Sequence, residues 1–387
     1  MALKASNTQL TGQRGNPSPG PEQADRPRTS INYDGGSYVR EGNHDGEDKS
    51  LKGTRKHGLE IEITTMTPNT PNTRADFPLL AVGISAHTPG RIKLEGKKVF
   101  DSIVERGYPI GKVLADRAYL PGSVAEELQG PLRKQGFELV FDYKKTELGI
   151  TDYFADAIQV GGQWYLSVMP DDLINARTLH QKTMESIKRK SPETKAKREM
   201  RKAREAEADG ILQDRYSQRK NYLFTRKGRP DAEGFQRFFY PDPNNYLNVN
   251  KITGEILAPI ATKTLTIPAD RGLKYGQLLA HESAEWKAWF GMRSIIEGFN
   301  GYVKDPTYEG IEDAGRRRAR GNTFAYLASV MALVSANLRK IFRFLQNSLS
   351  PKPLTAKTRA KRRTLPGWAE ANQATLAIST ETVPPPQ

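Results

Sequence analysis

Apolar and polar positions between residues 30 and 142 follow an order that predicts a mixed sheet with two helices. Three strand-like runs come first, and a helix, a strand, a second helix and a last strand follow. Consecutive strands joined by short loops are expected to be antiparallel, whereas strand–helix–strand steps give parallel crossovers. The expected strands are residues 30–40, 57–66, 78–86, 108–115 and 137–142, and the expected helices are residues 96–106 and 123–135.

Two of these runs are the most informative. The run PLLAVGISA (residues 78–86) is almost entirely apolar, which is typical of a central strand buried on both faces. In residues 96–106, Val99, Ile103 and Val104 recur at helical spacing, and Gly107 follows where a C-cap glycine is expected. The order predicts an α/β fold with a ribonuclease H-like mixed sheet flanked by helices, although other α/β folds share it.

The pattern changes after residue 143. Residues 144–280 hold short strand-like pieces around a charged helical stretch, and we expect a β-rich insertion subdomain with a basic helical part. Long helical patterns return in residues 281–348, which are expected to be the C-terminal helices of the core that residues 30–143 begin. The segments 1–29 and 349–387 lack periodicity, and the second is basic, so both are expected to be disordered.

The net charge of the chain indicates which kind of partner it binds. The 387 residues include 59 Lys and Arg against 44 Asp and Glu, which gives a formal net charge of +15. Within residues 181–230 there are 16 basic residues and 7 acidic ones, so much of the surplus lies in the expected insertion. A positive surplus of this size favours a polyanionic partner, with nucleic acid as the first candidate.

Other features exclude several classes of protein. The chain has no cysteine, which excludes disulfide scaffolds, thiolate zinc sites and cysteine nucleophiles. The longest apolar run, residues 324–338, is interrupted by Ser329, Ser335 and Asn337 and is too short to span a membrane. Residues 1–29 lack the apolar core of a secretory signal. The sequence therefore predicts a soluble, cytoplasmic protein without a membrane partner.

Acidic residues beside apolar strands are the first candidates for chemistry. Asp116 follows the apolar run KVLA directly, and Asp34 lies within the first strand-like run. If the first and fourth strands are neighbours, the two carboxylates meet at one edge, and paired carboxylates suit Mg²⁺. The alternatives are a loop-capping Asp116 paired with Arg117, and a turn around Asp34, where further aspartates (Asp45, Asp48) lie nearby.

A third carboxylate comes from the stretch EWKAWFGMRSIIEGFNGYVK, which is predicted to be a helix. Phe290, Arg293, Glu297 and Lys304 are separated by three, four and seven residues, so all four lie on one helical face. An aromatic ring, two cations and a carboxylate suit a helix that brings a metal ligand and phosphate contacts to DNA. In the simpler alternative, Glu297 is a solvated glutamate paired with Arg293, and the cations are exposed helix charges.

These motifs together resemble the DDE transposases of the bacterial insertion-sequence type. The spacing matches their Y-x2-R-x3-E-x6-K signature, with Phe290 in the tyrosine position. The stretches RSIIEGFNGYVKD, VLADRAY and YDGGSYVREGNHDG resemble the same family, and the resemblance covers roughly residues 31–344. Its motifs are specific jointly and weak singly.

The resemblance implies a ribonuclease H-like catalytic domain with an insertion between the second aspartate and the glutamate. Here that interval is 181 residues. Asp34, Asp116 and Glu297 would hold two Mg²⁺ ions, for which Mn²⁺ can substitute, while Arg293 and Lys304 would grip DNA phosphates and Phe290 would contact the DNA. The implied substrates are transposon terminal inverted repeats and target DNA, and the implied state is a homodimer on DNA in the bacterial nucleoid.

Further DNA contacts are suggested by the residues of the insertion. Trp164 is a candidate for stacking on an unpaired base, although a tryptophan between strand-like pieces is more often a core residue. The basic stretch 188–204, with the arginines around residue 318, is expected to contact the DNA backbone. The five histidines show no ligand spacing, so no metal role is expected for them.

Three functions compete at this stage. The first is a metal-dependent DNA transposase. Only 33 residues precede Asp34, which leads us to expect a truncated copy, so the second is a catalytically silent remnant that only binds DNA. The third is another nuclease of ribonuclease H-like fold, such as a resolvase, which does not account for the spacing from Arg293 to Lys304.

Overall fold

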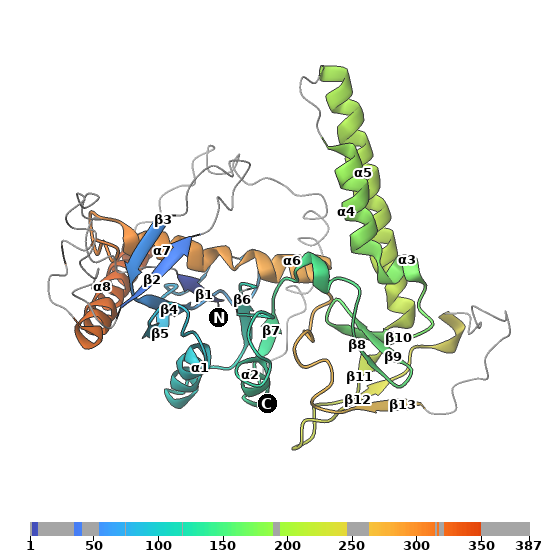
Figure 1. Ribbon diagram of the computed structural model, residues 1–387, viewed down its shortest axis with the longest axis horizontal. Helices are drawn as coiled ribbons and strands as arrows, with labels where there is room; N and C mark the ends of the chain where they lie inside the picture. The colour runs from blue at the N-terminus through green and yellow to red at the C-terminus, as the bar shows by residue number, and fades with distance from the viewer. Residues whose placement is uncertain are drawn as a thin grey trace, which may run out of the picture. The chain divides into compact units, whose positions relative to one another are not determined.

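The structure is a computed structural model that describes residues 2–6, 35–40, 54–73, 75–117, 119–188, 194–245, 263–313, 316 and 321–349. The chain divides into two compact units. Unit 1 comprises residues 1–137 and 287–387, and unit 2 comprises residues 138–286. Both units combine strands and helices, so the architecture is mixed α/β (Figure 1). No helix in the described ranges is long and apolar enough to cross a membrane.

Unit 1 is built on a mixed sheet. The part of this sheet that lies in unit 1 has the strand order β5-β4-β1-β6. Strand β4 pairs antiparallel with both β5 and β1, whereas β1 and β6 are parallel. The strands are β1 (Ala2–Ser6), β4 (Glu60–Thr65), β5 (Ala81–His87) and β6 (Lys112–Ala115).

Helices cover both faces of this sheet, which is why all six residues of β4 are buried. Figure 1 shows α1 and α7 on opposite sides of the strands. Helix α1 packs on β5 and β4, α7 packs on β1 and β4, and α8 contacts β5 and α7. The core between them includes Ile61, Phe100 and Phe299, each at most 1% exposed. The helices of unit 1 are α1 (Glu95–Glu105), α2 (Gln129–Lys134), α7 (Ser294–Lys304) and α8 (Asn322–Leu349).

Polar side chains anchor the inner face of α8. The Asn337 side-chain amide accepts a hydrogen bond from the Ala81 N–H and donates one to the Ala81 carbonyl, both at 2.9 Å. The guanidinium of Arg339 pairs with the carboxylate of Glu309, whose side chain is only 3% exposed. The same guanidinium lies 3.9 Å from the ring centre of Tyr302 and 3.8 Å from that of Tyr308. Helix α8 is therefore held to β5 and to the segment after α7.

The first strand of the sheet differs from the expectation. Residues 30–40 were expected to be the first strand and residues 1–29 to be disordered, yet β1 in the sheet is Ala2–Ser6. Strand β2 (Gly36–Arg40) pairs instead with β3 (Thr54–Gly58) in a separate two-stranded sheet. An alternating pattern identifies a strand but not its neighbour, because tertiary packing sets the pairing. A five-residue segment such as ALKAS is also too short to show a period.

A second correction concerns residues 78–86, which were expected to form a central strand. Strand β5 stands at the end of the strand order, beside β4 only. This edge strand is still apolar because both α1 and α8 pack against it. The side chain of Asn337 satisfies both backbone groups of Ala81, a way of covering a strand edge.

Unit 2 contains two three-stranded antiparallel sheets, ordered β10-β9-β8 and β11-β12-β13. Its larger core cluster includes Trp164, Phe224 and Phe238. Helices α4 and α5 pack together as a long hairpin, drawn in green in Figure 1. The elements are β7 (Glu138–Val140), β8 (Ile150–Phe154), β9 (Ala157–Val160), β10 (Gln163–Leu166), α3 (Asp171–Ile174), α4 (Ala176–Ile187), α5 (Lys195–Gln218), β11 (Thr225–Arg226), β12 (Gln236–Phe239) and β13 (Thr264–Ile267), with short 3₁₀ helices at Lys145–Glu147, Arg219–Tyr222 and Pro243–Asn245. Helix α6 (Ala284–Gly291) begins in unit 2 and ends in unit 1.

Candidate active site

Asp116 stands where β6 ends. Leu114 and Ala115 before it are fully buried, and Tyr119 and Leu120 after it are at most 2% exposed, so the turn between them is fixed at both ends. The Asp116 carbonyl accepts hydrogen bonds from the N–H groups of Tyr119 and Leu120, both at 3.0 Å. One carboxylate oxygen, Oδ1, accepts from the Arg117 N–H at 2.8 Å. The side chain is 39% exposed, and its other oxygen, Oδ2, faces Arg293.

Glu297 lies in the first turn of α7. Its neighbour Ile296 is fully buried, together with Phe299 and Val303 one and two turns further on. These apolar residues fix the rotation of the helix against the sheet, so Glu297 points away from the core with its side chain 44% exposed. The N-terminal end of a helix dipole also favours a carboxylate at this place.

Arg293 brings these two carboxylates together. Its Nη1 lies 3.0 Å from Glu297 Oε1 and 3.7 Å from Asp116 Oδ2. Because one nitrogen reaches both acids, the two carboxylates lie no further apart than these two distances combined. The pair comes from segments on either side of unit 2 in the sequence. Two of the three carboxylates expected from the sequence are therefore neighbours in unit 1.

The helix that was expected to run from residue 285 to 304 is in fact two helices. Helix α6 ends at Gly291 and α7 begins at Ser294. Between them, the N–H groups of Met292 and Arg293 bond to carbonyls three residues back. The chain tightens at a Gly-Met-Arg sequence, where glycine has low helix propensity. The four signature residues consequently do not lie on one continuous helical face.

The remaining signature residues have ordinary partners. The ring of Phe290 lies 5.4 Å from the Arg293 guanidinium carbon, a cation–π contact that helps to orient this arginine. Lys304, the last residue of α7, places its Nζ 2.6 Å from a carboxylate oxygen of Glu312. The structure therefore groups Phe290 with Arg293 at the carboxylates and gives Lys304 a separate ion pair.

Two other candidate residues stand apart from this group. Asp34 lies outside the described residues, and so do Asp45 and Asp48. Trp164 is 7% exposed and belongs to the core cluster of unit 2, so in this structure its ring is packed and not offered to a base. Among the described residues, no group of three or more acidic, histidine or cysteine side chains could hold a metal ion.

Sequence reasoning missed a buried polar cluster under α1. Strand β4 alternates apolar and acidic residues, and its acids were not expected to be buried. Glu62 is 1% exposed, and its Oε1 lies 2.9 Å from the Nε2 of His87 on β5. The other ring nitrogen of His87 lies 3.7 Å from Glu60. Nearby, Glu95 accepts hydrogen bonds from Ser85 and from Lys98.

Burial and hydrogen bonding shift the protonation of this cluster. Burial is the main cause that raises the pKa of Glu62, and the hydrogen bond and charge of His87 oppose it. For His87, burial alone would lower the pKa, but the hydrogen bond with Glu62, the Thr88 carbonyl and the charges of Glu62 and Glu60 together raise it. The cluster therefore favours a protonated His87 beside Glu62. Its signal in the sequence was the acidic alternation GLEIEIT.

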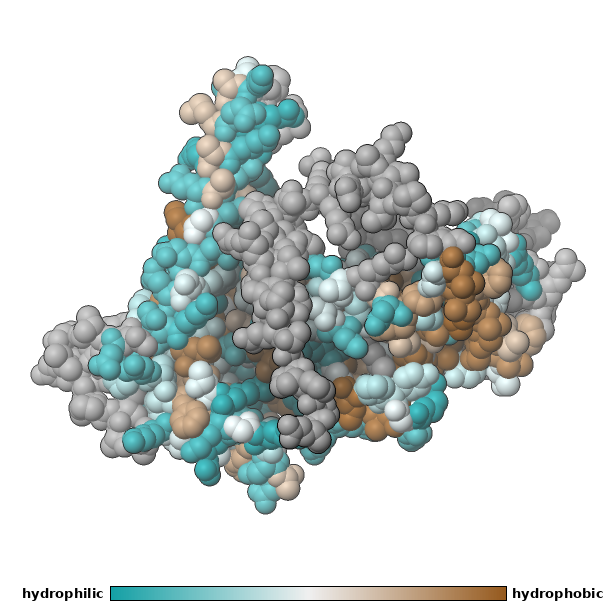
Figure 2. Space-filling model, turned by 180° about the vertical axis from the view of Figure 1, so that it is seen from behind, coloured by the Kyte–Doolittle hydropathy of each residue, from teal (hydrophilic) through white to brown (hydrophobic). Residues whose placement is uncertain are grey.

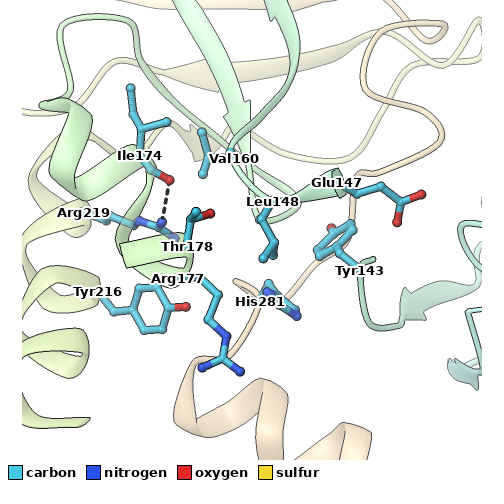
Figure 3. Close-up of a pocket in the computed structure, with 12 residues that line it drawn as sticks. Tyr143, Glu147, Leu148, Val160, Ile174, Arg177, Thr178, Tyr216, Arg219 and His281 are labelled. Carbon is cyan, nitrogen blue, oxygen red and sulfur yellow. Dashed lines mark hydrogen bonds between the residues drawn. The ribbon is translucent and has the colours of Figure 1, made fainter. Parts of the chain in front are cut away.

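A small pocket in unit 2 is lined by several charged and aromatic side chains (Figure 3). Arg219 is 6% exposed and donates to the carbonyls of Leu173, at 2.8 Å, and Ile174, at 3.2 Å, which end helix α3. His281 lies 2.9 Å from Asp142 and is stacked edge-on between aromatic rings. Both side chains already have partners within the unit, so we assign this pocket a structural role.

No protein-family model matches the chain, and no significant match is found among curated proteins or solved structures. What the protein does is therefore inferred from its own residues and geometry.

Proposed function

We propose that the protein is a DNA transposase of the DDE type, which cuts DNA at transposon ends and joins the ends to target DNA. The observation that carries this proposal is the contact of one guanidinium, that of Arg293, with Asp116 and Glu297. A structural ion pair needs one acid. A second carboxylate, brought in from a distant segment and left 39% exposed, suits a group that binds a ligand.

The strand arrangement supports the ribonuclease H-like part of the proposal. Three antiparallel strands in the order β5-β4-β1, with β6 parallel to β1, are the arrangement expected of such a sheet. Asp116 stands at the carboxyl end of β6, which is the edge of an α/β sheet where ligands commonly bind. In this interpretation β1 supplies the first strand, and the remaining carboxylate, Asp34, comes from the segment before β2.

The chemistry of these side chains suits Mg²⁺. Asp116 and Glu297 offer hard carboxylate oxygens, the ligands that Mg²⁺ prefers, and both are partly exposed. With Asp34 they would hold two ions. When bound, the ions activate an attacking oxygen and stabilise the leaving oxygen of a phosphodiester. Arg293 holds the two carboxylates together and supplies a positive charge for the DNA phosphate, and Phe290 orients that arginine.

Helix α5 is proposed to bind the DNA backbone. Almost every residue in its first half is exposed, and the cations Lys195, Arg198 and Lys202 follow one another at helical spacing. Part of this charge is paired locally: Arg201 Nη1 lies 2.5 Å from Glu205 Oε1, and Lys202 Nζ lies 3.9 Å from Glu199 Oε1. Exposed lysines and arginines on one helix face bind phosphates without regard to sequence.

Cleavage by acid-to-amide variants tests the proposal. Full-length protein is incubated with duplex DNA that carries the flanking sequence of its own gene, with Mg²⁺ or Mn²⁺, and the 3′ ends are mapped. Asp116→Asn and Glu297→Gln are expected to cut at least about 100-fold more slowly, because each removes a carboxylate that the reaction needs. Glu126→Gln, at an exposed acid of unit 1, is the matched control and should cut like the parent.

The alternative function is a DNA-binding remnant without catalysis, which the basic α5 favours. If the parent binds DNA in a salt-dependent way and makes no metal-dependent cuts, this alternative replaces the transposase. If Asp116→Asn cuts as fast as the parent, the proposed site is wrong. A chain that cuts but never joins a 3′ end to a second DNA would be a simple nuclease.

A further inference from the structure

Arg293 places a positive charge at the two carboxylates of the candidate site. Its Nη1 lies 3.0 Å from Glu297 Oε1 and 3.7 Å from Asp116 Oδ2. Since Mg²⁺ binds carboxylate oxygens at about 2.0–2.1 Å, an ion on this Glu297 oxygen would lie within about 5 Å of the arginine nitrogen. Two cations this close repel each other. Arg293 in this position therefore competes with a metal ion for the same oxygens.

The arginine also reduces the charge that attracts a metal ion. Asp116 and Glu297 together carry two negative charges, and the guanidinium neutralises one of them. The affinity of a carboxylate site for a divalent ion depends on the number of its negative charges. Both effects act in the same direction, so the two acids bind a metal ion more weakly while Arg293 contacts them.

The side chain of Arg293 can move while its backbone stays in place. The backbone N–H donates to the Phe290 carbonyl at 3.0 Å in the turn before α7, and the adjacent Met292 is buried. The side chain itself is 24% exposed and is held by the two acids and by the ring of Phe290. Because it lies at the surface, it can exchange these partners for another anion without unfolding the helix.

A phosphate group is the anion that best suits this exchange. A guanidinium binds phosphate through two parallel hydrogen bonds, so phosphate competes strongly for Arg293. Further cations lie on the same strand and turn: Arg117 is exposed directly after Asp116, and Lys112 Nζ lies 4.7 Å from the ring centre of Trp289. The outer face of α8, by contrast, is hydrophobic (Figure 2). DNA is therefore expected to meet unit 1 at the cations around Asp116.

We propose that Arg293 acts as a latch on the metal site: Asp116 and Glu297 bind the metal ion once a DNA phosphate has drawn the guanidinium away. The inference rests on the proposed function, from which it takes both the DNA and the metal ion. Because coupling between two ligands is reciprocal, DNA raises the affinity for the metal ion, and the metal ion raises the affinity for DNA by the same factor. The metal ion is thus recruited by the DNA on which it acts.

Metal binding without DNA tests the latch directly. Full-length protein is titrated with Mn²⁺, and binding is followed by electron paramagnetic resonance. Arg293→Gln removes the charge and is expected to bind Mn²⁺ at least about 10-fold more tightly than the parent. Arg343→Gln is the matched control and should bind Mn²⁺ like the parent, because Arg343 is exposed and contacts Tyr302 and Tyr308 in place of the two acids. Circular dichroism verifies that each variant is folded.

Two further measurements locate the gain and test its coupling to DNA. The double variant Arg293→Gln/Asp116→Asn is expected to lose the tight Mn²⁺ binding, because the gain arises at the carboxylates. Duplex DNA with the flanking sequence of the gene should raise the Mn²⁺ affinity of the parent at least about 10-fold, and that of Arg293→Gln by much less. Asp116→Asn with the same DNA provides the blank for ions that the DNA itself binds.

The latch is overturned if the parent without DNA binds Mn²⁺ as tightly as Arg293→Gln does. Tight binding that survives in the double variant, or an equal gain from DNA in the parent and in Arg293→Gln, would also overturn it. Each of these results is compatible with DNA cutting by the parent, which would leave the proposed function in place. Conversely, a parent that never cuts DNA would refute the transposase, while a tighter Mn²⁺ site in Arg293→Gln would still support the latch.

Discussion

The ion pair between Arg339 and Glu309 lies at the base of α8 and allows a quantitative test of how this helix is held. Glu309 is buried, with its side chain 3% exposed, and accepts hydrogen bonds from Arg339 Nε at 2.9 Å and from Ser335 Oγ at 3.0 Å. The Arg339 side chain is 19% exposed and stacked between two tyrosine rings. Replacing Arg339 by methionine keeps most of the side-chain volume and removes the charge.

The expected destabilisation by Arg339→Met follows from this geometry. Breaking a buried ion pair by removing one partner costs about 3–5 kcal/mol, because the remaining charge is buried without compensation. The absence of the cation–π interactions adds about 1 kcal/mol or less for each ring. Removing both charges avoids the buried carboxylate, so the double variant Arg339→Met/Glu309→Gln is expected to recover most of the stability.

Urea unfolding followed by circular dichroism measures these differences at one fixed protein concentration. Arg343→Met serves as the control, because Arg343 is one turn further along α8, is exposed and lies 5.3 Å or more from the same rings. It should change the free energy of unfolding by less than about 1 kcal/mol. A destabilisation below about 1 kcal/mol for Arg339→Met would refute the reasoning, as would a double variant that is no more stable than the single one.

Two further predictions concern charge elsewhere in the chain. Folding raises the pKa of His87, so the stability that His87 contributes is complete below about pH 6.5 and is lost as the pH rises through its raised pKa; the raised pKa of Glu62 acts in the same direction but from lower pH, because burial disfavours its charged form. Thermal unfolding between pH 5 and 9 should show this decline, and His87→Gln should flatten it; an unchanged slope would contradict the assignment. On α5, changing Lys195, Arg198 and Lys202 to glutamine should make DNA binding less dependent on salt. The slope of the logarithm of the binding constant against the logarithm of the salt concentration should become shallower by about 0.9 for each phosphate that the variant no longer neutralises. Equal slopes for parent and variant, measured by titration at several salt concentrations, would show that α5 does not bind the DNA.

Local patterns in the sequence were sufficient for many elements of unit 1. The helical period through Val99 and Ile103 places α1 within one residue of its observed bounds, and the KVLA half of the strand expected at residues 108–115 becomes β6. These elements are long or strongly apolar, so their own residues decide their structure. The position of β1 could not be predicted from local patterns, because a five-residue segment shows no period. Its strand conformation depends on pairing with the neighbouring strands of the sheet.

In the candidate site, too, local contacts could be predicted from the sequence and contacts between distant segments could not. The spacing of Arg293 and Glu297 indicated their ion pair as the simpler alternative to a metal ligand, since residues four apart on a helix are neighbours. Their meeting with Asp116 depends on how α7 packs against the sheet, which a sequence pattern does not contain. The break at Met292 and the burial of Trp164 were also missed, because each is decided by neighbours that are distant in the chain.

The placement of unit 2 between the two halves of unit 1 has a consequence for protein synthesis. Asp116 leaves the ribosome long before Glu297, and at about 5–20 residues per second the interval of 181 residues takes about 10–40 s to make. During that time the aspartate has neither the glutamate nor Arg293 beside it. A chain that ends before Glu297 consequently lacks the carboxylate pair. The proposed DNA-cutting chemistry therefore requires a chain that extends past Glu297, and shorter fragments are expected not to cut DNA.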